Sequence, residues 1–157
     1  ATIEEFDDSL RVYRTGDLEP LNIKTMPHPG FPTDMQPLMT VLLTLAKGTS
    51  IITEGIWENR FRYVDELTRM GANIQVDGRV AVIEGVQELL PAPMRAADLR
   101  AGAALVVAAL AADGVSEVDA ICHIERGYED IVEKLRGLGA DIKRVEKPAG
   151  VLRQAAL

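Results

Sequence analysis

Two stretches of the chain, residues 33–72 and 97–140, share one pattern of hydrophobic and polar positions. Each pattern predicts an apolar helix, a strand, a second helix that ends in Gly-Ala, and then another strand. Matching residues recur at separations that grow from 64 to 68 positions, as short loop insertions would cause. The sequence thus predicts an α+β fold built from repeated βαβαββ units. The matched pairs are Asp34 with Asp98, Arg60 with Arg126, and Gly71 with Gly139.

Turn and cap signals define the elements of the first unit. The pair Asp77-Gly78 separates two alternating stretches, which is typical of a β-hairpin. Thr33 and Gln36 match a capping box, and Asn59 is a suitable N-cap for a second helix. Gly71 is a suitable helix end. The expected helices are residues 34–47 and 60–70, and the expected strands are 10–13, 21–26, 50–54, 73–76 and 79–83.

The second unit shows the same alternation with smaller side chains. Its first helix, 99–112, carries alanine on nearly every face, which predicts that other elements surround it closely. Three strands, at 86–90, 115–121 and 141–145, and a helix at 127–138 complete the pattern. We expect three segments: an acidic N-terminal part (1–20), a folded part (21–145, in units 21–90 and 91–145) and a loose tail (146–157).

Composition narrows the class of protein. The 157 residues carry a net charge of −7, which argues against a nucleic-acid or membrane surface because such surfaces need clustered Lys and Arg. The one cysteine, Cys122, excludes a disulfide within the chain and fits a cytoplasmic location. The sequence begins with Ala, so we expect a processed chain or a piece of a longer one.

Three arginines, at positions 60, 100 and 126, fall in the first turn of predicted helices, where a cation opposes the helix dipole. One interpretation is local pairing, because Glu58, Asp98 and Glu125 are near in sequence. The other is a bound anion that contacts both the guanidinium and the helix N-terminus. Asp34 and Asp98 have a similar choice between helix capping and function.

Other candidate residues carry weaker signals. His28 and His123 lack the spacing of metal ligands, so we expect no metal and no cofactor. Cys122 and His123 would point to opposite faces of a strand, which disfavours a nucleophilic pair. Trp57 is either a core anchor or the wall of a pocket. The methionines at 35, 39 and 70 are expected in the core.

Several strings resemble one family of enzymes, the enolpyruvyl transferases that act on UDP-N-acetylglucosamine in peptidoglycan synthesis. The strings are PHPGFPTDMQ, ITEGIWENRF, DELTRMGA, ADLRAGAAL and HIERGYEDIVEKLRGLGA. The resemblance runs from about residue 21 to 145 and corresponds to the C-terminal third of the family's chain. It implies a prism-like domain with helices inside and sheets outside, of which this chain holds two of six units. It also implies a cytoplasmic role in cell wall biogenesis, cell shape and cell division.

The resemblance further implies roles for individual residues. Asp34 matches an aspartate that binds the sugar nucleotide and serves as the proposed base. Ile56 matches a position whose backbone contacts the sugar nucleotide, and Trp57 stands beside it at a substrate-binding position where the family usually has Phe. Arg60, Arg100 and Arg126 match arginines near phosphoenolpyruvate, and Arg100 and Arg126 are expected to bind its carboxylate and phosphate. Asp98 matches the acid of the family's DLR motif, which orients its surroundings, and Leu99 belongs to the same motif.

The chain also departs from the family pattern. No segment matches the loop that carries the family's proton-donating Cys or Asp, and Cys122 stands where the family commonly has Tyr. We therefore expect half an active site, no turnover by the chain alone, and self-association or pairing with the absent domain. Two alternatives stay open: a shikimate-pathway enolpyruvyl transferase, and a non-catalytic binding or scaffold module of the same fold.

Overall fold

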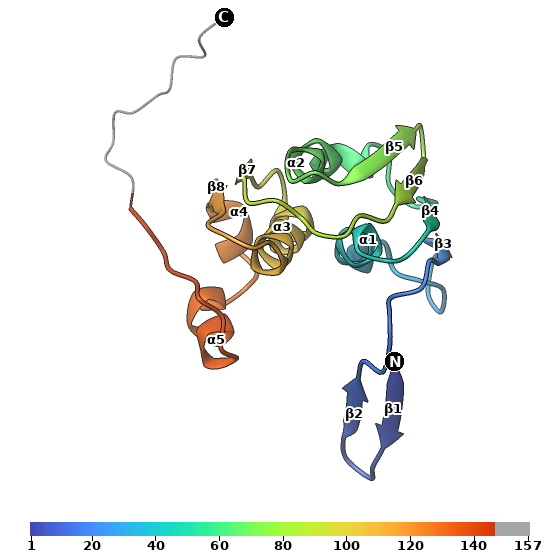
Figure 1. The fold of residues 1–157 in the computed structure, drawn as a ribbon, viewed down its shortest axis with the longest axis horizontal. Coiled ribbons are helices and arrows are strands. Elements are labelled where there is room, and N and C mark those ends of the chain that lie inside the picture. The colour runs from blue at the N-terminus through green and yellow to red at the C-terminus, as the bar shows by residue number, and fades with distance from the viewer. Residues whose placement is uncertain (147–157) are drawn as a thin grey trace, which may run out of the picture.

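The computed structural model describes residues 1–146. The chain begins with a hairpin in which β1 (Thr2–Glu5) pairs antiparallel with β2 (Leu10–Tyr13). This hairpin projects away from the rest of the molecule (Figure 1). The strand predicted at 10–13 is therefore confirmed, whereas its partner β1 was not expected. Apart from Glu146, the predicted loose tail (146–157) lies outside the described residues.

The main sheet has the order β3-β4-β6-β5. Its first two strands, β3 (Asn22–Lys24) and β4 (Thr49–Thr53), are parallel, while β6 (Val80–Glu84) is antiparallel to both β4 and β5 (Asn73–Asp77). The last pair is the hairpin that Asp77-Gly78 predicts. Gly78 has a φ of 55°, which glycine adopts without strain. The sheet confirms the four predicted strands of the first unit.

Two helices, one from each unit, pack side by side, and the first of them also packs against this sheet (Figure 1). The first is α1 (Gln36–Thr44), which follows a 3₁₀ turn η1 (Thr33–Met35). The second is the alanine-rich α3 (Leu99–Ala111), and it is buried as its composition predicts. Small side chains let neighbouring elements approach closely: a Cβ on Gly102 would lie 2.6 Å from the Ile124 side chain. The two units thus share one core.

The second helix of the first unit supplies much of that core. It begins as a 3₁₀ turn, η2 (Arg60–Tyr63), and continues as α2 (Val64–Arg69). Leu67 and Met70 are fully buried, as the spacing of apolar residues predicts. Met35, in contrast, is 44% exposed, so the expectation that it belongs to the core is wrong.

The predicted N-caps of the first unit are wrong. Pro32 precedes the 3₁₀ turn, and the Thr33 hydroxyl donates to Glu54 instead of closing a capping box. Asn59 has a φ of 53° and makes no side-chain cap hydrogen bond. In both cases the helix starts with a 3₁₀ turn. The tighter hydrogen bonds of this turn satisfy backbone N–H groups that would otherwise donate to a capping side chain.

Residues 86–90 form an irregular segment instead of the expected strand. Their backbone donors go to helix ends: Val86 N–H to the Thr44 carbonyl and Leu90 N–H to the Met70 carbonyl. Just before this segment, a Cβ on Gly85 would lie 1.6 Å from the Ala46 carbonyl oxygen. The segment therefore caps the C-terminal ends of α1 and α2, because its N–H groups donate to carbonyls that have no partner within those helices.

The second unit is more fragmented than expected. Its strands β7 (Pro93–Arg95) and β8 (Glu117–Asp119) form a small parallel pair. The helix predicted at 127–138 is shortened to α5 (Ile131–Gly137), and an unexpected short helix, α4 (Cys122–Glu125), precedes it. Asp130 between them has a φ of 47°, which breaks helical geometry. Cys122 and His123 lie in α4, so the expectation that they occupy a strand is wrong.

The expected strand at 141–145 is absent from the described structure. The equivalent strand of the first unit, β5, has β6 as a partner, and a strand without a neighbour leaves its backbone groups unpaired. The helix ends before these segments nevertheless match. Gly71 and Gly139 have φ values of 85° and 94°, and the next residue of each donates to the carbonyl of Leu67 or Leu135. In residues 1–146, no helix combines the length and apolar character of a membrane span.

Candidate active site

Both units contribute to one cleft of about 530 Å³, which we call the arginine cleft. It contains seven of the eight residues that sequence analysis selected; Ile56 does not line it. Asp34 and Trp57, from the first unit, both line it. The described residues that line the cleft are Asp34, Trp57, Glu58, Asn59, Arg60, Arg62, Asp98, Leu99, Arg100 and Arg126.

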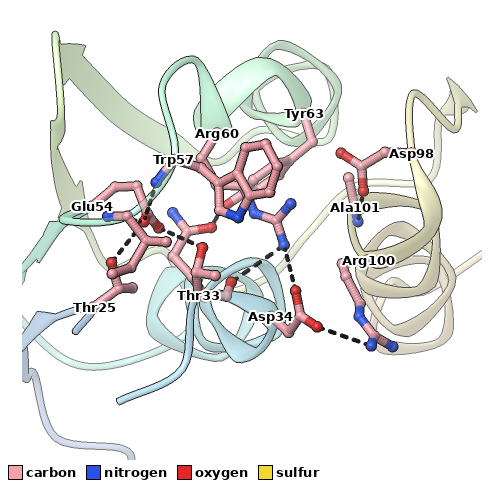
Figure 2. A network of polar contacts seen from close by, with 12 residues as sticks. Thr25, Thr33, Asp34, Glu54, Trp57, Arg60, Tyr63, Asp98, Arg100 and Ala101 are labelled. Carbon is pink, nitrogen blue, oxygen red and sulfur yellow. Dashed lines mark hydrogen bonds and ion pairs between the residues drawn. The ribbon is translucent and has the colours of Figure 1, made fainter. Parts of the chain in front are cut away.

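The carboxylate of Asp34 lies between two guanidinium groups (Figure 2). One oxygen contacts Arg60 Nη2 at 3.3 Å, and the other contacts Arg100 Nη2 at 2.9 Å. Asp34 comes from the 3₁₀ turn before α1, whereas Arg100 comes from the first turn of α3. Because the Asp34 side chain is 54% exposed, its carboxylate remains accessible to a ligand in the cleft.

Arg100 has a second fixed partner. Its Nη1 donates to the Tyr128 hydroxyl at 3.1 Å, and its guanidinium carbon lies 5.9 Å from the centre of that ring. The Tyr128 hydroxyl and the Asp34 carboxylate raise the pKa of Arg100 above its ordinary value. Arg100 is therefore fixed in position and permanently charged, and its remaining N–H donors are available for an anion.

Arg60 is the most buried arginine of the cleft, with 13% of its side chain exposed. Its Nη2 also donates to the Thr33 carbonyl, while its buried Nε has no hydrogen-bond partner. Nearby, the Tyr63 hydroxyl contacts Gln36 and Thr40 in the core. Burial raises the pKa of Tyr63 far above its ordinary value, which outweighs the opposing effects of these hydrogen bonds and of Arg60. Tyr63 therefore stays neutral and serves as packing behind Arg60.

Asp98 acts as a helix cap. Its carboxylate accepts from the Ala101 N–H at 2.8 Å, so the capping interpretation of this residue is confirmed. Leu99 follows it and contacts the backbone near Gly127, where a Cβ would lie 2.9 Å from the leucine side chain. These contacts fix the first turn of α3 and with it the direction of Arg100.

Arg126 lines the cleft, but its helical position differs from the prediction. It follows the end of α4 as that helix's C-cap instead of starting a helix. Arg60 begins a short 3₁₀ turn, so only Arg100 stands in the first turn of a long α-helix. The shared cleft therefore arises from the way the two units pack, and not from three equivalent helix N-termini.

Trp57 forms a wall of the cleft, and this resolves the choice between core anchor and pocket wall. Its side chain is exposed and lines the same cleft as Asp34 and Arg60. Ile56 precedes it on the same segment, and both backbone N–H groups donate to the Glu54 carboxylate. Sequence analysis selected Ile56 for a backbone contact, and its N–H is occupied by Glu54 in this structure.

Four residues in or next to the cleft were not selected as site residues from the sequence. Glu58, Asn59 and Arg62 line the cleft directly, and Tyr128 holds Arg100. Three of them belong to the strings ENRF and RGYE, so those motifs were the available signal. Among the described residues, four arginines and three carboxylates line the cleft, which makes it locally cationic in an acidic protein.

Metal ligands do not gather in this cleft or elsewhere in the described residues, where no group of three or more His, Cys, Asp or Glu is placed to hold an ion. Cys122 is exposed on α4, and its thiol contacts the Ala120 carbonyl. The chemistry available to the cleft is thus that of carboxylates and guanidinium groups. Such a set can bind an anionic ligand and remove a proton from a hydroxyl.

Comparison with known proteins agrees with this chemistry. A family model described as EPSP synthase (3-phosphoshikimate 1-carboxyvinyltransferase) matches residues 1–135. The fold is also that of a solved enolpyruvyl transferase, NikO from Streptomyces tendae, with a TM-score of 0.85 and 33% identity over 94% of this chain. An EPSP synthase from Acinetobacter baumannii shares the fold with a TM-score of 0.57. The chain therefore belongs to the EPSP synthase family of enolpyruvyl transferases.

Curated relatives carry a more specific name. UDP-N-acetylglucosamine 1-carboxyvinyltransferase 3 of Caldanaerobacter subterraneus is 57% identical over 145 residues, and a relative with the same activity name from Carboxydothermus hydrogenoformans is 58% identical over 142 residues. These matches cover 92% and 90% of this chain but only 35% and 34% of the relatives. The chain thus spans about a third of their length. A relative from Desulfofundulus thermocisternus is covered to 58%.

Proposed function

We propose that this chain forms one wall of the active site of a transferase that moves the enolpyruvyl group of phosphoenolpyruvate to the 3-hydroxyl of UDP-N-acetylglucosamine. The observation that carries the proposal is the Asp34 carboxylate between Arg60 and Arg100, contributed by two units to one cleft. Relatives at 54–58% identity carry the name of this activity. The proposal places the chain in peptidoglycan synthesis, cell shape and cell division, and in the cytoplasm.

Phosphoenolpyruvate is the ligand assigned to the arginines. It carries a carboxylate and a phosphate, and planar guanidinium groups bind both with paired N–H donors. Arg100 uses one donor on Asp34 and one on Tyr128, so other donors of its fork stay available. Arg60 and Arg126 line the same cleft and add positive charge. Asp98 and Leu99 support this ligand indirectly, through the first turn of α3.

UDP-N-acetylglucosamine is the ligand assigned to Asp34 and Trp57, which line the cleft, and to Ile56, which directly precedes Trp57 but does not line the cleft. The exposed indole of Trp57 offers an apolar face in the same cleft as the Asp34 carboxylate. A carboxylate next to a sugar hydroxyl can accept its proton. Asp34 is therefore the residue to which we assign removal of the proton from the 3-hydroxyl.

The reaction consists of an addition and an elimination. The sugar oxygen bonds to C2 of phosphoenolpyruvate while a proton joins C3, which gives a tetrahedral ketal with a new methyl group. Loss of phosphate and of one methyl proton then restores the double bond. The arginines stabilise the negative charge of the phosphate as it leaves. We assign the proton donor of the first step to no residue of this chain, and so expect no turnover by the chain alone.

Calorimetric titration of the purified chain tests the proposal. We expect saturable binding of UDP-N-acetylglucosamine, and of phosphoenolpyruvate in its presence, without release of phosphate in a coupled assay. Absence of saturable binding by either ligand would favour a non-catalytic scaffold of the same fold. Binding of shikimate 3-phosphate in place of the sugar nucleotide would favour the shikimate-pathway enzyme, and normal phosphate release would contradict a half site.

We also propose that the chain self-associates or pairs with another domain through the β1–β2 hairpin. The register places Ile3 opposite Val12, and Leu10 lies on the same face. All three are more than 60% exposed in the described structure. An apolar face of this kind favours association with a partner. Analytical ultracentrifugation should show a concentration-dependent mass, and a monomer at all concentrations without a partner domain would count against self-association.

A further inference from the structure

Glu54 carries a buried carboxylate at the end of β4. Only 1% of the residue is exposed, and its partners among residues 1–146 are hydrogen-bond donors instead of a cation. Oε1 accepts from the Thr25 hydroxyl at 2.7 Å and from the N–H groups of Ile56 and Trp57 at 2.8 and 3.0 Å. Oε2 accepts from the Thr33 hydroxyl at 3.0 Å. A buried carboxylate is costly unless its oxygens are satisfied in this way.

These donors come from three separate parts of the chain (Figure 2). Thr25 follows β3, Thr33 directly precedes Asp34, and the other two N–H groups belong to the segment that carries Trp57. The approach is close, because Gly55 N–H donates to the Thr25 hydroxyl and a Cβ on Gly55 would lie 2.4 Å from the Thr25 carbonyl oxygen. The backbone N–H of Glu54 itself donates to the carbonyl of Arg79, which directly precedes the neighbouring strand β6. The carboxylate is thus anchored in the sheet and reaches toward the cleft.

We propose that Glu54 is a positioning residue that sets the wall of the arginine cleft formed by Asp34 and Trp57. Its carboxylate fixes the residue before Asp34 and the backbone of Ile56 and Trp57 relative to each other. Ile56 and Trp57 lie in no helix or strand, and Thr33 begins only the short 3₁₀ turn η1, so these hydrogen bonds supply order that secondary structure does not. The predicted effect of Glu54 on ligand binding rests on the proposed function. The positioning itself is a property of the ligand-free chain.

Burial raises the pKa of Glu54, but the hydrogen bonds from Thr25, Trp57, Ile56 and Thr33 outweigh it, so the pKa lies below the ordinary value. The group is therefore ionised at neutral pH and accepts at both oxygens. A glutamine at this position retains an amide oxygen for the three donors of Oε1, and its NH₂ can donate to the Thr33 hydroxyl. Glu54→Gln thus preserves the contacts without the charge, whereas Glu54→Ala removes them.

Amide hydrogen exchange of the ligand-free chain, followed by NMR, tests the positioning directly. In Glu54→Ala we expect the Ile56 and Trp57 amides to exchange at least tenfold faster than in the wild type, while Glu54→Gln stays within about threefold. Glu54→Asp keeps the charge but shortens the reach, and should give intermediate acceleration in a chain that still folds. Glu84→Ala is the matched control, because Glu84 accepts from the Thr49 hydroxyl at an exposed strand end. It should leave both amides unchanged.

Ligand affinity supplies the second readout. Glu54→Ala should weaken binding of UDP-N-acetylglucosamine at least tenfold and binding of phosphoenolpyruvate less, because the arginines bind the latter. Unchanged amide exchange in Glu54→Ala or, if that variant does not fold, in Glu54→Asp would overturn the proposal. Equal acceleration in Glu54→Gln and Glu54→Ala would also overturn it, because charge and not hydrogen bonding would then be responsible. Failure of the wild type to bind either ligand would refute the proposed function alone, since the exchange experiment uses no ligand.

Discussion

Asp34 and Arg100 form a 2.9 Å ion pair across 66 residues of sequence. Asp34 belongs to the first unit and Arg100 to the second, so this contact joins the two units at the floor of the arginine cleft. Both side chains are partly exposed, and exposed ion pairs contribute at most about 1 kcal/mol to stability. The pair therefore matters more for the geometry of the cleft than for folding.

Replacement of Arg100 by lysine should distinguish the contribution of the guanidinium geometry to ligand binding from that of the positive charge. Arg100→Lys keeps the positive charge but loses the fork that reaches Asp34 and Tyr128 together. We expect phosphoenolpyruvate to bind at least about tenfold more weakly, with a change in unfolding free energy below about 0.5 kcal/mol. Calorimetry and urea unfolding measure the two effects. Arg136→Lys, at an exposed ion pair on α5, is the control and should change neither.

Removal of the Asp34 carboxylate between the two arginines should strengthen the binding of anions, whereas Arg100→Lys should weaken it. Asp34→Asn keeps the size of the side chain but no longer offsets the charge of Arg60 and Arg100. We expect inorganic phosphate to bind about threefold to tenfold more tightly, because the competing carboxylate is gone. Titration with phosphate at low salt measures the change. Weaker phosphate binding in this variant would show that Asp34 does not compete for these arginines.

The close approach at Gly85 predicts a large stability effect far from the cleft. An alanine Cβ would lie 1.6 Å from the Ala46 carbonyl oxygen, which is backbone and cannot move aside cheaply. We expect Gly85→Ala to lower the unfolding free energy by about 3 kcal/mol or more, or to prevent folding. Gly137→Ala, in α5 with open space around it, should stabilise the chain by up to about 1 kcal/mol. Urea unfolding compares the two, and an equal effect of both would contradict the packing described for α1.

The lowered pKa of Glu54 predicts a specific pH dependence of stability. A carboxyl whose pKa is lower in the folded than in the unfolded state stabilises fully above the unfolded value, here 4.5. That stabilisation is lost as the pH falls below 4.5 and through the folded pKa. We expect the unfolding free energy to decrease less steeply in Glu54→Gln than in the wild type between about pH 5 and 3. Parallel slopes, measured by urea unfolding at several pH values, would contradict the ionised state of Glu54.

Sequence reasoning was most successful where one local signal determines one local structure. The Asp77-Gly78 turn, the buried alanine-rich helix and the matched glycines at 71 and 139 are all confirmed. It failed where tertiary contacts replaced the local choice. Thr33 resembles a capping residue, but its hydroxyl is bound by Glu54, a residue 21 positions away that no local pattern connects to it.

The candidate cleft illustrates the same limit. Motif resemblance selected seven of its lining residues. The physical explanation given for the three arginines was that each lies in the first turn of its own helix. Arg126 lies instead at the end of α4, and the helix predicted directly after it begins only at Ile131, because Asp130 has a positive φ. Which residues meet was predictable from motifs, whereas how they meet depended on packing between two units.

The central claim is that the arginines of this cleft bind one multiply charged anion together. NMR of the guanidinium Nε–H signals during titration with phosphoenolpyruvate, in the presence of UDP-N-acetylglucosamine, tests it most directly. We predict that the signals of Arg60, Arg100 and Arg126 shift with one common dissociation constant, while that of Arg136 on α5 stays unchanged. Shifts with unrelated dissociation constants, or equal shifts of Arg136, would contradict a shared anion site.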